Sequence, residues 1–401
     1  MGDVRAKWFS RRAADRRRGG GRLAVAVALI AGGLLLSGCA DVPGVGGTSG
    51  PPTPSDPSTS GTARPSKPGA PDEITLVATG DVLLHERLWT TARRDGRNGT
   101  LDFAPLLSGV KPLVQSADLA ICHLETPLGT PYSGYPLFQG PPQIAPALKQ
   151  TGYDACSTAS NHSFDKGAAG IDRTLNTLDK AGLRHMGTAR TPAEAATPTI
   201  VEVQGVKVAL LSYTYGFNGV PYPDGETWRA GKLDVPAMKA MAKKARDLGA
   251  EIVVISCHWG DEYSKSANPQ QREIAAQLLA DSNIDLVLGH HAHVVQPVEQ
   301  LNGKWVVYGM GNLVAAHRSP ATTKSEGLLV RFTFRRAGDH WKADAQYAPL
   351  LVTDTVPVRV LDVRRELAKP GLSAARRARL ELADRRTTQT VTSLGAAPKP
   401  L

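Results

Sequence analysis

The chain has 401 residues, of which 41% are hydrophobic and 21% charged, enough apolar sequence to bury the core of one large domain. Its net charge of +10 is unevenly placed: the residues before Cys39 contribute about +6, so only about +4 is left for the rest of the chain. A nucleic-acid surface would require a clustered basic stripe, and we therefore expect no nucleic-acid partner.

The first 38 residues predict an export signal. Basic residues precede an apolar run from Leu23 to Leu36, which ends in Leu36-Ser37-Gly38-Cys39. This pattern resembles a bacterial lipoprotein signal peptide, in which positive residues stay cytoplasmic and small residues permit cleavage. A retained helix and an ordinary cleaved signal are the alternatives, although the apolar run is short for a hydrocarbon core about 30 Å thick. We predict a lipid on Cys39 and an extracytoplasmic chain anchored at the cell membrane.

Residues 39–72 predict a disordered tether behind the lipidated cysteine, because Gly, Pro, Ser and Thr dominate them. Three further cysteines follow, Cys122, Cys156 and Cys257, each in an apolar run typical of a small core residue. An odd number cannot pair completely within one chain, which excludes a disulfide scaffold but leaves one disulfide open. We do not expect thiol catalysis.

From Ile74 onward, short β-branched runs alternate with helical segments. Ile171, Leu175 and Leu178 fall at i, i+4 and i+7, which predicts a helix that Gly182 ends, and Gln204-Gly205 predicts a hairpin turn. The pattern predicts an α/β domain over residues 73–355, with sheets packed together and flanked by helices, followed by a charged, helical and partly disordered extension over 356–401. Strands are expected at 74–79, 118–125, 153–158, 199–203, 206–213, 251–257, 284–289, 305–310 and 328–334, and helices at 168–181, 236–248 and 269–281.

Polar side chains that can bind metal follow these strands. Open α/β sheets place ligand sites beyond the carboxyl ends of their strands, so residues far apart in sequence are expected to meet at one rim. The strand endings carry Asp81, His123, Glu125, Asn161, His162, His258, His290, His291 and His293.

Carboxylate, amide and imidazole together suit divalent ions such as Zn, Mn or Fe. His291 and His293 stand at i, i+2, and an extended backbone would present both imidazoles on the same side. Glu125 could bridge two cations. The set predicts two divalent metal ions, which could hold an oxyanion and lower the pKa of a bound water.

At these residues the sequence resembles a known family. GDVLLH (80–85), HLETPLG (123–129), SNHSFDKG (160–167), HWGDEY (258–263), GHHAHVVQP (289–297) and YGMGNLV (308–314) are similar to the ordered motifs of the CapA family, the bacterial poly-gamma-glutamate capsule biosynthesis proteins. That family is similar to the calcineurin-like metallophosphatases. The resemblance implies a two-sheet β-sandwich flanked by helices.

The resemblance also implies residue roles. Asp81 and His293 would serve one metal, Glu125 would bridge, and Asn161, His258 and His291 would serve the other. His162 would be the general acid, with a structural histidine as the alternative.

Two positions depart from the expected motifs. The superfamily commonly has Asp-x-His where this chain has Asp81 and Leu83, with His85 arriving later, and His123 stands where the CapA family usually has Asn. His85 and His123 are therefore candidate metal or substrate contacts. Glu262 and Tyr263 are candidates for the same role or for orienting His258. Asp165 and Gly167 are expected to shape a loop and a helix start.

The resemblance and the donor set together predict a metal-dependent hydrolase in capsule or cell-envelope polymer biosynthesis. Its substrate would be a phosphoester or an amide of an anionic gamma-linked glutamate polymer, and a capsule synthesis complex is a candidate partner. The alternative is a nonhydrolytic, metal-containing factor that binds or exports the polymer. A binding protein with a vestigial site is a third interpretation.

Overall fold

The computed structural model describes residues 71–317, 323–396 and 398–401. The expected leader, Cys39 and all but the last two residues of the expected tether lie outside the described residues. Within the described residues, no helix is long and apolar enough to cross a bilayer.

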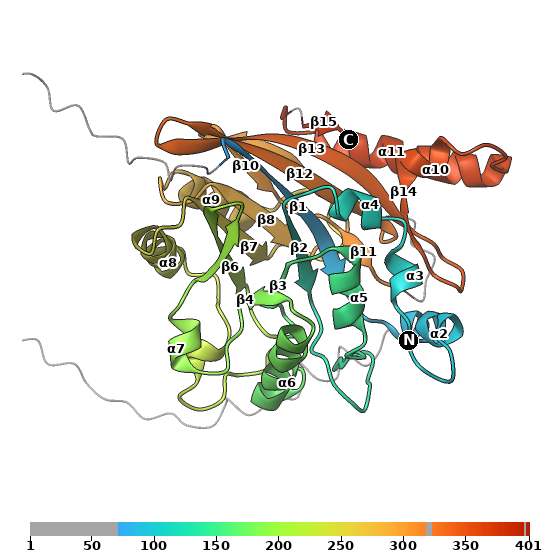
Figure 1. Cartoon of the computed structure of the whole chain (residues 1–401), viewed down its shortest axis with the longest axis horizontal. Coiled ribbons are helices and arrows are strands. Elements are labelled where there is room, and N and C mark those ends of the chain that lie inside the picture. Colours follow the sequence, from blue (N-terminus) through green and yellow to red (C-terminus); the bar gives the residue numbers. More distant parts are fainter. Residues whose placement is uncertain (1–70, 318–322, 397) are drawn as a thin grey trace, which may run out of the picture. The chain divides into compact units, whose positions relative to one another are not determined.

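Two sheets form the centre of the domain, which confirms the predicted α/β class with two packed sheets (Figure 1). The larger sheet has the order β14-β13-β12-β1-β2-β3-β4, with β11 beside β1 and β15 beside β13. The smaller has the order β5-β6-β7-β8-β10-β9. The larger sheet contains β1 (Glu73–Val82), β2 (Leu119–Leu124), β3 (Ala155–Ser157), β4 (Arg184–Met186), β11 (Asn312–Val314), β12 (Glu326–Ala337), β13 (His340–Val352), β14 (Val360–Asp362) and β15 (Lys399–Pro400). The smaller contains β5 (Thr199–Val203), β6 (Val206–Thr214), β7 (Ile252–His258), β8 (Leu286–His290), β9 (Val298–Leu301) and β10 (Lys304–Val307).

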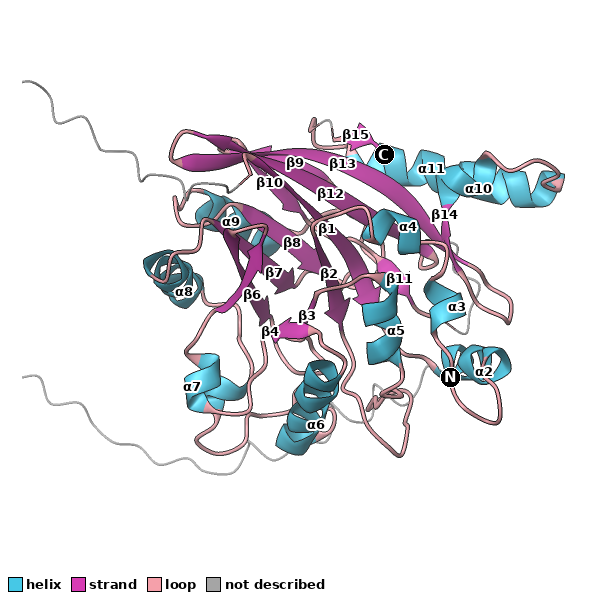
Figure 2. Ribbon diagram, viewed as in Figure 1, coloured by secondary structure: helices cyan, strands magenta, loops and turns pink. Residues whose placement is uncertain are grey.

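Helices cover the outer faces of the sheets (Figure 2). The larger sheet packs against α2 (Glu86–Asp95), α3 (Ala104–Leu107), α4 (Lys111–Val114), α5 (Ile144–Thr151) and α6 (Gly167–Lys180). The smaller packs against α8 (Val235–Asp247) and α9 (Pro269–Leu279). The three predicted helices are therefore confirmed as α6, α8 and α9, and α6 ends just before Gly182, whose φ of +73° continues no right-handed helix.

The apolar core between the sheets follows from strand alternation. Leu76 and Leu119 of the larger sheet face Val208, Val254 and Leu286 of the smaller, and each is at most 1% exposed. Their neighbours in sequence point outward to the helices, as a period of two requires. The strands are thus buried on both faces, which explains their nearly continuous apolar runs.

The predicted hairpin is confirmed. β5 and β6 pair antiparallel, and Gln204 (φ +49°) and Gly205 (φ +88°) make the two-residue turn between them. Both left-handed residues match the turn type that suits the twist of the flanking strands.

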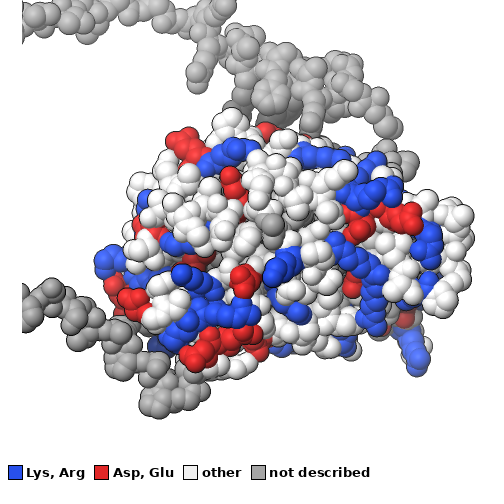
Figure 3. Space-filling model, turned by 90° about the horizontal axis from the view of Figure 1, so that it is seen from above, with Lys and Arg blue, Asp and Glu red and all other residues white. Residues whose placement is uncertain are grey.

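Residues 356–401 contain the expected helices, α10 (Val363–Leu367) and α11 (Ala374–Val391), together with two short strands. β14 and β15 both pair with β13, and Leu380 of α11 packs against Leu361 and Val363. The expected domain boundary at residue 355 falls between β13 and β14. Figure 3 shows basic and acidic side chains interspersed over the face of the molecule seen there.

Candidate metal centre

The rim of the site is made where parallel strands of both sheets end. β1, β2 and β3 are parallel in the larger sheet, and β6, β7 and β8 are parallel in the smaller. Their carboxyl ends therefore lie on the same side of each sheet, and their last residues meet in the layer between the sheets.

A bulge aims Asp81 into this layer. Ala78 faces the inner core, so strict alternation would turn Asp81 outward, but the pairing of β1 with β2 shifts register between Ala78 and Asp81. Val82 accordingly joins the outer core. Gly80 permits this path, because a Cβ there would lie 2.0 Å from the carbonyl oxygen of Gly311.

Strand alternation aims three histidines into the same layer. His123 follows Ile121 by two residues in β2, His290 follows Leu288 by two in β8, and both of these apolar residues face the inner core. His258 ends β7 on the inner side by the same period of two. All three imidazoles are at most 3% exposed.

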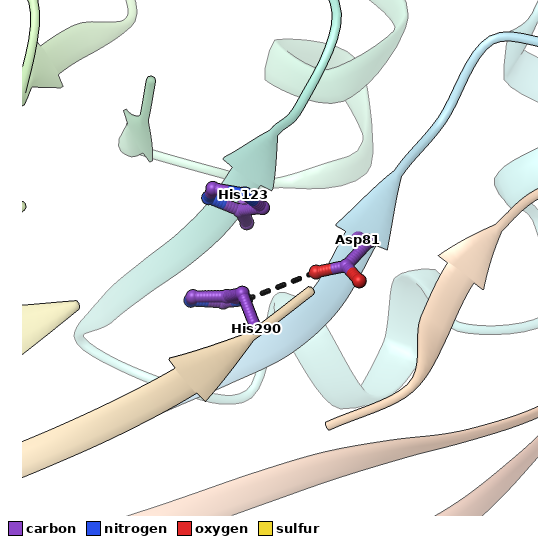
Figure 4. A group of neighbouring side chains, drawn as sticks. All are labelled: Asp81, His123 and His290. Atoms are coloured by element: carbon purple, nitrogen blue, oxygen red, sulfur yellow. Dashed lines mark ion pairs between the residues drawn. The ribbon is translucent and has the colours of Figure 1, made fainter. Parts of the chain in front are cut away.

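The first group of candidate ligands contains Asp81, His123 and His290, with ligand atoms within 4.8 Å of one another. Figure 4 shows the carboxylate of Asp81 directed at His290, where Oδ1 lies 3.2 Å from Nδ1. The rings of His123 and His290 stack with centroids 4.0 Å apart. Three residues from three strands thus present donors to one small volume.

The second group contains Glu125, His291 and His293, again within 4.8 Å. Nε2 of His293 lies 3.5 Å from Oε1 of Glu125, and its Nδ1 lies 3.2 Å from Oδ2 of Asp81, so His293 connects the two groups. The prediction of an extended backbone at His291 and His293 was wrong. β8 ends at His290, and the two histidines have φ of +87° and +56°. Non-glycine residues in this left-handed region are uncommon, and they concentrate at functional sites.

Asn161 and His258 join the cluster through a chain of hydrogen bonds. The carbonyl oxygen of Asn161 can only accept, so Nε2 of His258 donates to it at 2.9 Å. Nδ1 of His258 then accepts from Nε2 of His123, also at 2.9 Å. The Ser157 hydroxyl lies 2.8 Å from Nδ1 of His123. A metal ion bound to His258 would have to replace one of these contacts.

The donor set fits a metal ion because several of its atoms are buried without hydrogen-bond partners. These atoms include Oδ1 of Asp81, both carboxylate oxygens of Glu125, both ring nitrogens of His290 and Nδ1 of His291. Buried polar atoms are normally satisfied, and each exception needs an explanation. Divalent cations in the two groups would explain the carboxylate oxygens and one nitrogen of each imidazole.

The protonation states also suit a cation site. Burial lowers the pKa of His291 to about 4 and the pKa values of His123 and His258 well below the usual range, which leaves these rings neutral, as a ligand must be. Burial raises the pKa of Glu125 to about 7. Burial lowers the pKa of His293, but Glu125 and Asp81 outweigh it and raise the value to about 10. Without a cation, the acidic side chains therefore hold a proton on His293.

His162 lies beside this cluster and is held by Asp165. Its Nδ1 lies 2.7 Å from Oδ2 of Asp165, which also accepts from the backbone N–H of Phe138 at 2.8 Å. Burial makes the largest single contribution and lowers the pKa of His162, but the hydrogen bond to Asp165 and the charges of Glu125 and Asp165 together outweigh it and raise the pKa. The Phe138 ring stands edge-on to His162 at 4.8 Å. Asp165 was expected only to shape the loop, and it also orients the candidate acid.

The remaining candidates surround the cluster. Nδ1 of His85 accepts from the backbone N–H of Ala316, and its ring lies 4.9 Å from that of His317, outside both ligand groups. The Tyr263 ring lies 6.0 Å from that of His293 and is 43% exposed. Among the contributions to the raised pKa of Glu125, burial is the largest and the charge of Glu262 a smaller one, so Glu262 acts on the site electrostatically.

Three polar neighbours lie at the site although the sequence analysis assigned them no role there. His290 follows Leu288 by two residues in β8, so both side chains point toward the inner core. This alternation could be read from the sequence. Oδ1 of Asn312, in the segment YGMGNLV, lies 3.0 Å from Nδ1 of His293. The His317 ring lies 5.9 Å from that of His293, and no motif indicated it.

The cysteines do not enter the site as ligands. Cys122 and Cys156 are opposite each other on β2 and β3 and form a disulfide, directly before His123 and Ser157. Cys257 is a buried free thiol whose pKa is raised by burial. The structure thus contains the one disulfide that the odd number of cysteines left open.

Known proteins are similar in sequence to this chain over much of the domain. Residues 75–317 match the family described as bacterial capsule synthesis protein PGA_cap. The PGA biosynthesis protein CapA of Bacillus subtilis is 27% identical over 278 residues, which cover 67% of this chain and 69% of the relative. The capsule biosynthesis protein CapA of Bacillus anthracis is 28% identical over 214 residues, 53% of this chain and 51% of the relative. A probable polyglutamine synthesis accessory protein of Mycobacterium tuberculosis is 29% identical over 188 residues, 43% and 48% of the two chains.

Solved structures are more distant. A calcineurin-like phosphoesterase from Bacillus subtilis is 14% identical, with a TM-score of 0.44 over 79% of this chain and 98% of the other. A 5'-nucleotidase precursor from Thermus thermophilus is 16% identical, with a TM-score of 0.42 over 80% and 59%. At this level of identity and structural similarity, no activity of these two proteins can be assigned to this chain. The match to residues 75–317 covers more than half of the chain, and this protein belongs to the bacterial capsule synthesis family PGA_cap.

Proposed function

We propose that this protein is a lipid-anchored, extracytoplasmic hydrolase that uses two divalent metal ions in the biosynthesis of an anionic cell-envelope polymer of the poly-γ-glutamate type, and that it cleaves an amide of the polymer or a phosphoester. The observation that carries the proposal is the pair of buried ligand groups, in which the carboxylate oxygens of Glu125 and Oδ1 of Asp81 have no hydrogen-bond partner. Desolvating carboxylates without compensation is unfavourable, and a bound cation supplies the compensation.

The residues that would hold the ions are those of the two groups, with Asn161 and His258 completing the set. Mn, Zn and Fe all accept these ligand types. Divalent ions there would polarise the scissile group and lower the pKa of an attacking water. Cleavage of an amide and cleavage of a phosphoester both develop negative charge in the transition state, and a cationic site stabilises that charge.

His162 would supply the proton to the leaving group. Asp165 occupies its Nδ1, so Nε2 is the nitrogen left to donate. The raised pKa favours the protonated ring, and the edge-on Phe138 limits the access of water to it. Asp165 therefore acts through His162 as a positioning residue.

The relatives' names support a polymer substrate, because they refer to PGA biosynthesis and to polyglutamine synthesis. For this chain, a role in polymer synthesis is part of the proposal, because the chain matches only about half of the length of two of the three relatives. A role beside a capsule synthesis complex belongs to the same proposal.

The decisive experiment measures metal content and turnover on the full chain purified in detergent. We expect bound divalent metal and metal-dependent cleavage of poly-γ-glutamate or of one member of a phosphoester panel, both lost in His258→Ala. A wild-type chain with full metal occupancy and no turnover of any substrate would contradict the hydrolase.

A second candidate is a nonhydrolytic factor that holds or exports the polymer. It is favoured by His123, which stands where the family usually has Asn and whose Nε2 contacts Nδ1 of His258. Polymer that binds to the metal-loaded chain and is recovered uncleaved would support this function.

The membrane anchor is tested separately. We expect the full chain to incorporate labelled palmitate and to sediment with membranes, and Cys39→Ala to lose the label. Equal labelling of both proteins would contradict lipidation at Cys39.

A further inference from the structure

Large hydrophobic side chains that remain exposed gather around the candidate metal centre. In the part of the chain that the structure describes, the exposed ones are Tyr135 (74%), Leu137 (48%), Tyr215 (40%), Leu248 (46%) and Tyr263 (43%). Scattered exposed apolar residues are normal, but a group of them around one candidate site indicates a binding surface. Only Leu248, at the end of α8, lies on an element that does not contribute to the rim.

The three tyrosines approach the cluster from three different loops. The Tyr215 ring, after β6, lies 4.7 Å from that of His291. The Tyr263 ring, after β7, lies 6.0 Å from that of His293. Tyr135, in the loop after β2, lies 6.5 Å from Phe138, whose ring is 4.8 Å from the candidate acid His162. The tyrosines thus flank both ligand groups and the acid.

Tyr263 is held in place by the ligand loop itself. Its φ is +67°, a strained value for an aromatic residue, and its backbone N–H donates to the carbonyl of Ala292 at 2.7 Å, between His291 and His293. The ammonium of Lys324 lies 3.4 Å from the centre of its ring. The position therefore combines a flat aromatic surface with a positive charge beside the metal ligands.

These features suit a chain that is apolar along its stem and anionic at its branches. Tyrosine offers a large rigid surface at a low entropic cost, and methylene groups pack well against it. Lys324 can pair with a carboxylate. A γ-linked glutamate chain has both parts: backbone methylenes between its amides and a carboxylate on every residue.

We propose that Tyr135, Tyr215 and Tyr263 form binding subsites for successive residues of an extended γ-glutamyl chain that crosses the mouth of the metal centre, with Lys324 pairing with one of its carboxylates. This inference rests on the proposed function, because it takes the polymer as the substrate of the same site. It makes the tyrosines specificity-determining residues, and Tyr135, which reaches His162 only through Phe138, belongs to the outermost subsite.

The test compares the affinity of the manganese-loaded full chain for long poly-γ-glutamate and for the dipeptide γ-Glu-Glu. We expect each of Tyr135→Ala, Tyr215→Ala and Tyr263→Ala to weaken long-polymer binding roughly fivefold to tenfold, and each Tyr→Phe variant to keep wild-type affinity. Tyr135→Ala should leave dipeptide binding unchanged. Leu248→Ala is the matched control, because Leu248 is about as exposed as Tyr215 and Tyr263 but lies just after α8, and this variant should bind both probes as the wild type does.

Several results would overturn the inference. These are a wild type without affinity for the long polymer, alanine variants that bind it like the wild type, and a loss of bound manganese in parallel with polymer affinity. The outcome is separable from that of the proposed hydrolysis. Tyrosine-dependent binding without turnover would sink the hydrolase and keep the subsites, whereas turnover that all three alanine variants retain in full would do the reverse.

Discussion

Two polar regions of this protein differ in how their charged groups are satisfied. A cavity of about 490 Å³ lies between β4, β6 and α7 (Pro192–Ala195), but its charged lining is paired: Arg190 contacts Asp179 and Glu194 at 2.6 Å each, and His185 contacts Asp179 at 3.1 Å. At the rim, Oδ1 of Asp81 and both carboxylate oxygens of Glu125 are buried and accept no hydrogen bond, and the charged groups that approach them are histidines at 3.2 Å and 3.5 Å rather than arginines. The candidate metal site is therefore identified by buried polar atoms without hydrogen-bond partners, and not by the volume of a cavity.

Removing one carboxylate from each region should give the largest difference between them. Asp81→Ala should abolish metal binding and lower any metal-dependent turnover by at least about 10³-fold, because several kcal/mol of transition-state stabilisation depend on the ions. Asp179→Ala should leave metal content and turnover unchanged. Metal analysis and turnover of the two variants side by side check both statements, and a metal loss in Asp179→Ala would contradict the comparison.

The disulfide beneath the rim provides the next largest effect. Cys122 and Cys156 are 34 residues apart, and closing a loop of that length should stabilise the fold by roughly 4 kcal/mol in the chain-entropy model. We expect reductant to lower the denaturation midpoint of the wild type. The double variant Cys122→Ser/Cys156→Ser should start at the lower midpoint and not respond to reductant; a response would point to another bond.

The candidate acid gives a smaller change that leaves the metal in place. His162→Ala should lower turnover about 10²-fold while the metal content stays constant. In Asp165→Asn the hydrogen bond that raises the pKa of His162 is weakened, so the imidazolium is lost at lower pH. The alkaline limb of the pH–rate profile should therefore move to lower pH, and an unchanged limb would exclude His162 as the acid.

The smallest effect belongs to the paired cavity. Arg190 and Glu194 are each more than a quarter exposed, so solvent screens their attraction, and Arg190→Ala should lower the free energy of unfolding by only about 1 kcal/mol. Denaturant titration measures this change. Turnover and metal content should remain at the wild-type level, which would separate a structural ion-pair network from the reactive rim.

Much of the site could be predicted because its residues follow strands. Asp81, Glu125, Asn161, His258, His291 and His293 were identified as strand endings, and the structure brings all six together. His293 lies beside both Asp81 and Glu125, in keeping with the roles that the resemblance implied, and His290, to which the resemblance gave no role, joins His123 and Asp81. Strand order alone cannot tell which endings become neighbours across two sheets.

Other features had no local signal. The bulge that turns Asp81 inward depends on a carbonyl of Gly311, more than two hundred residues away, and the disulfide depends on the pairing of β2 with β3. Asp165 reaches His162 through a loop conformation, and β14 and β15 join the larger sheet only as partners of β13.

The family, the α/β class, the hairpin at Gln204-Gly205 and the chemical types of the ligands could be predicted from the sequence alone. These features depend on short-range periodicity and on side-chain chemistry. The tertiary structure decided which imidazole faces which carboxylate, which buried atoms stay unpaired and where the three tyrosines gather. Those properties arise from contacts between segments distant in the chain, and no local pattern encodes the distance between two such segments.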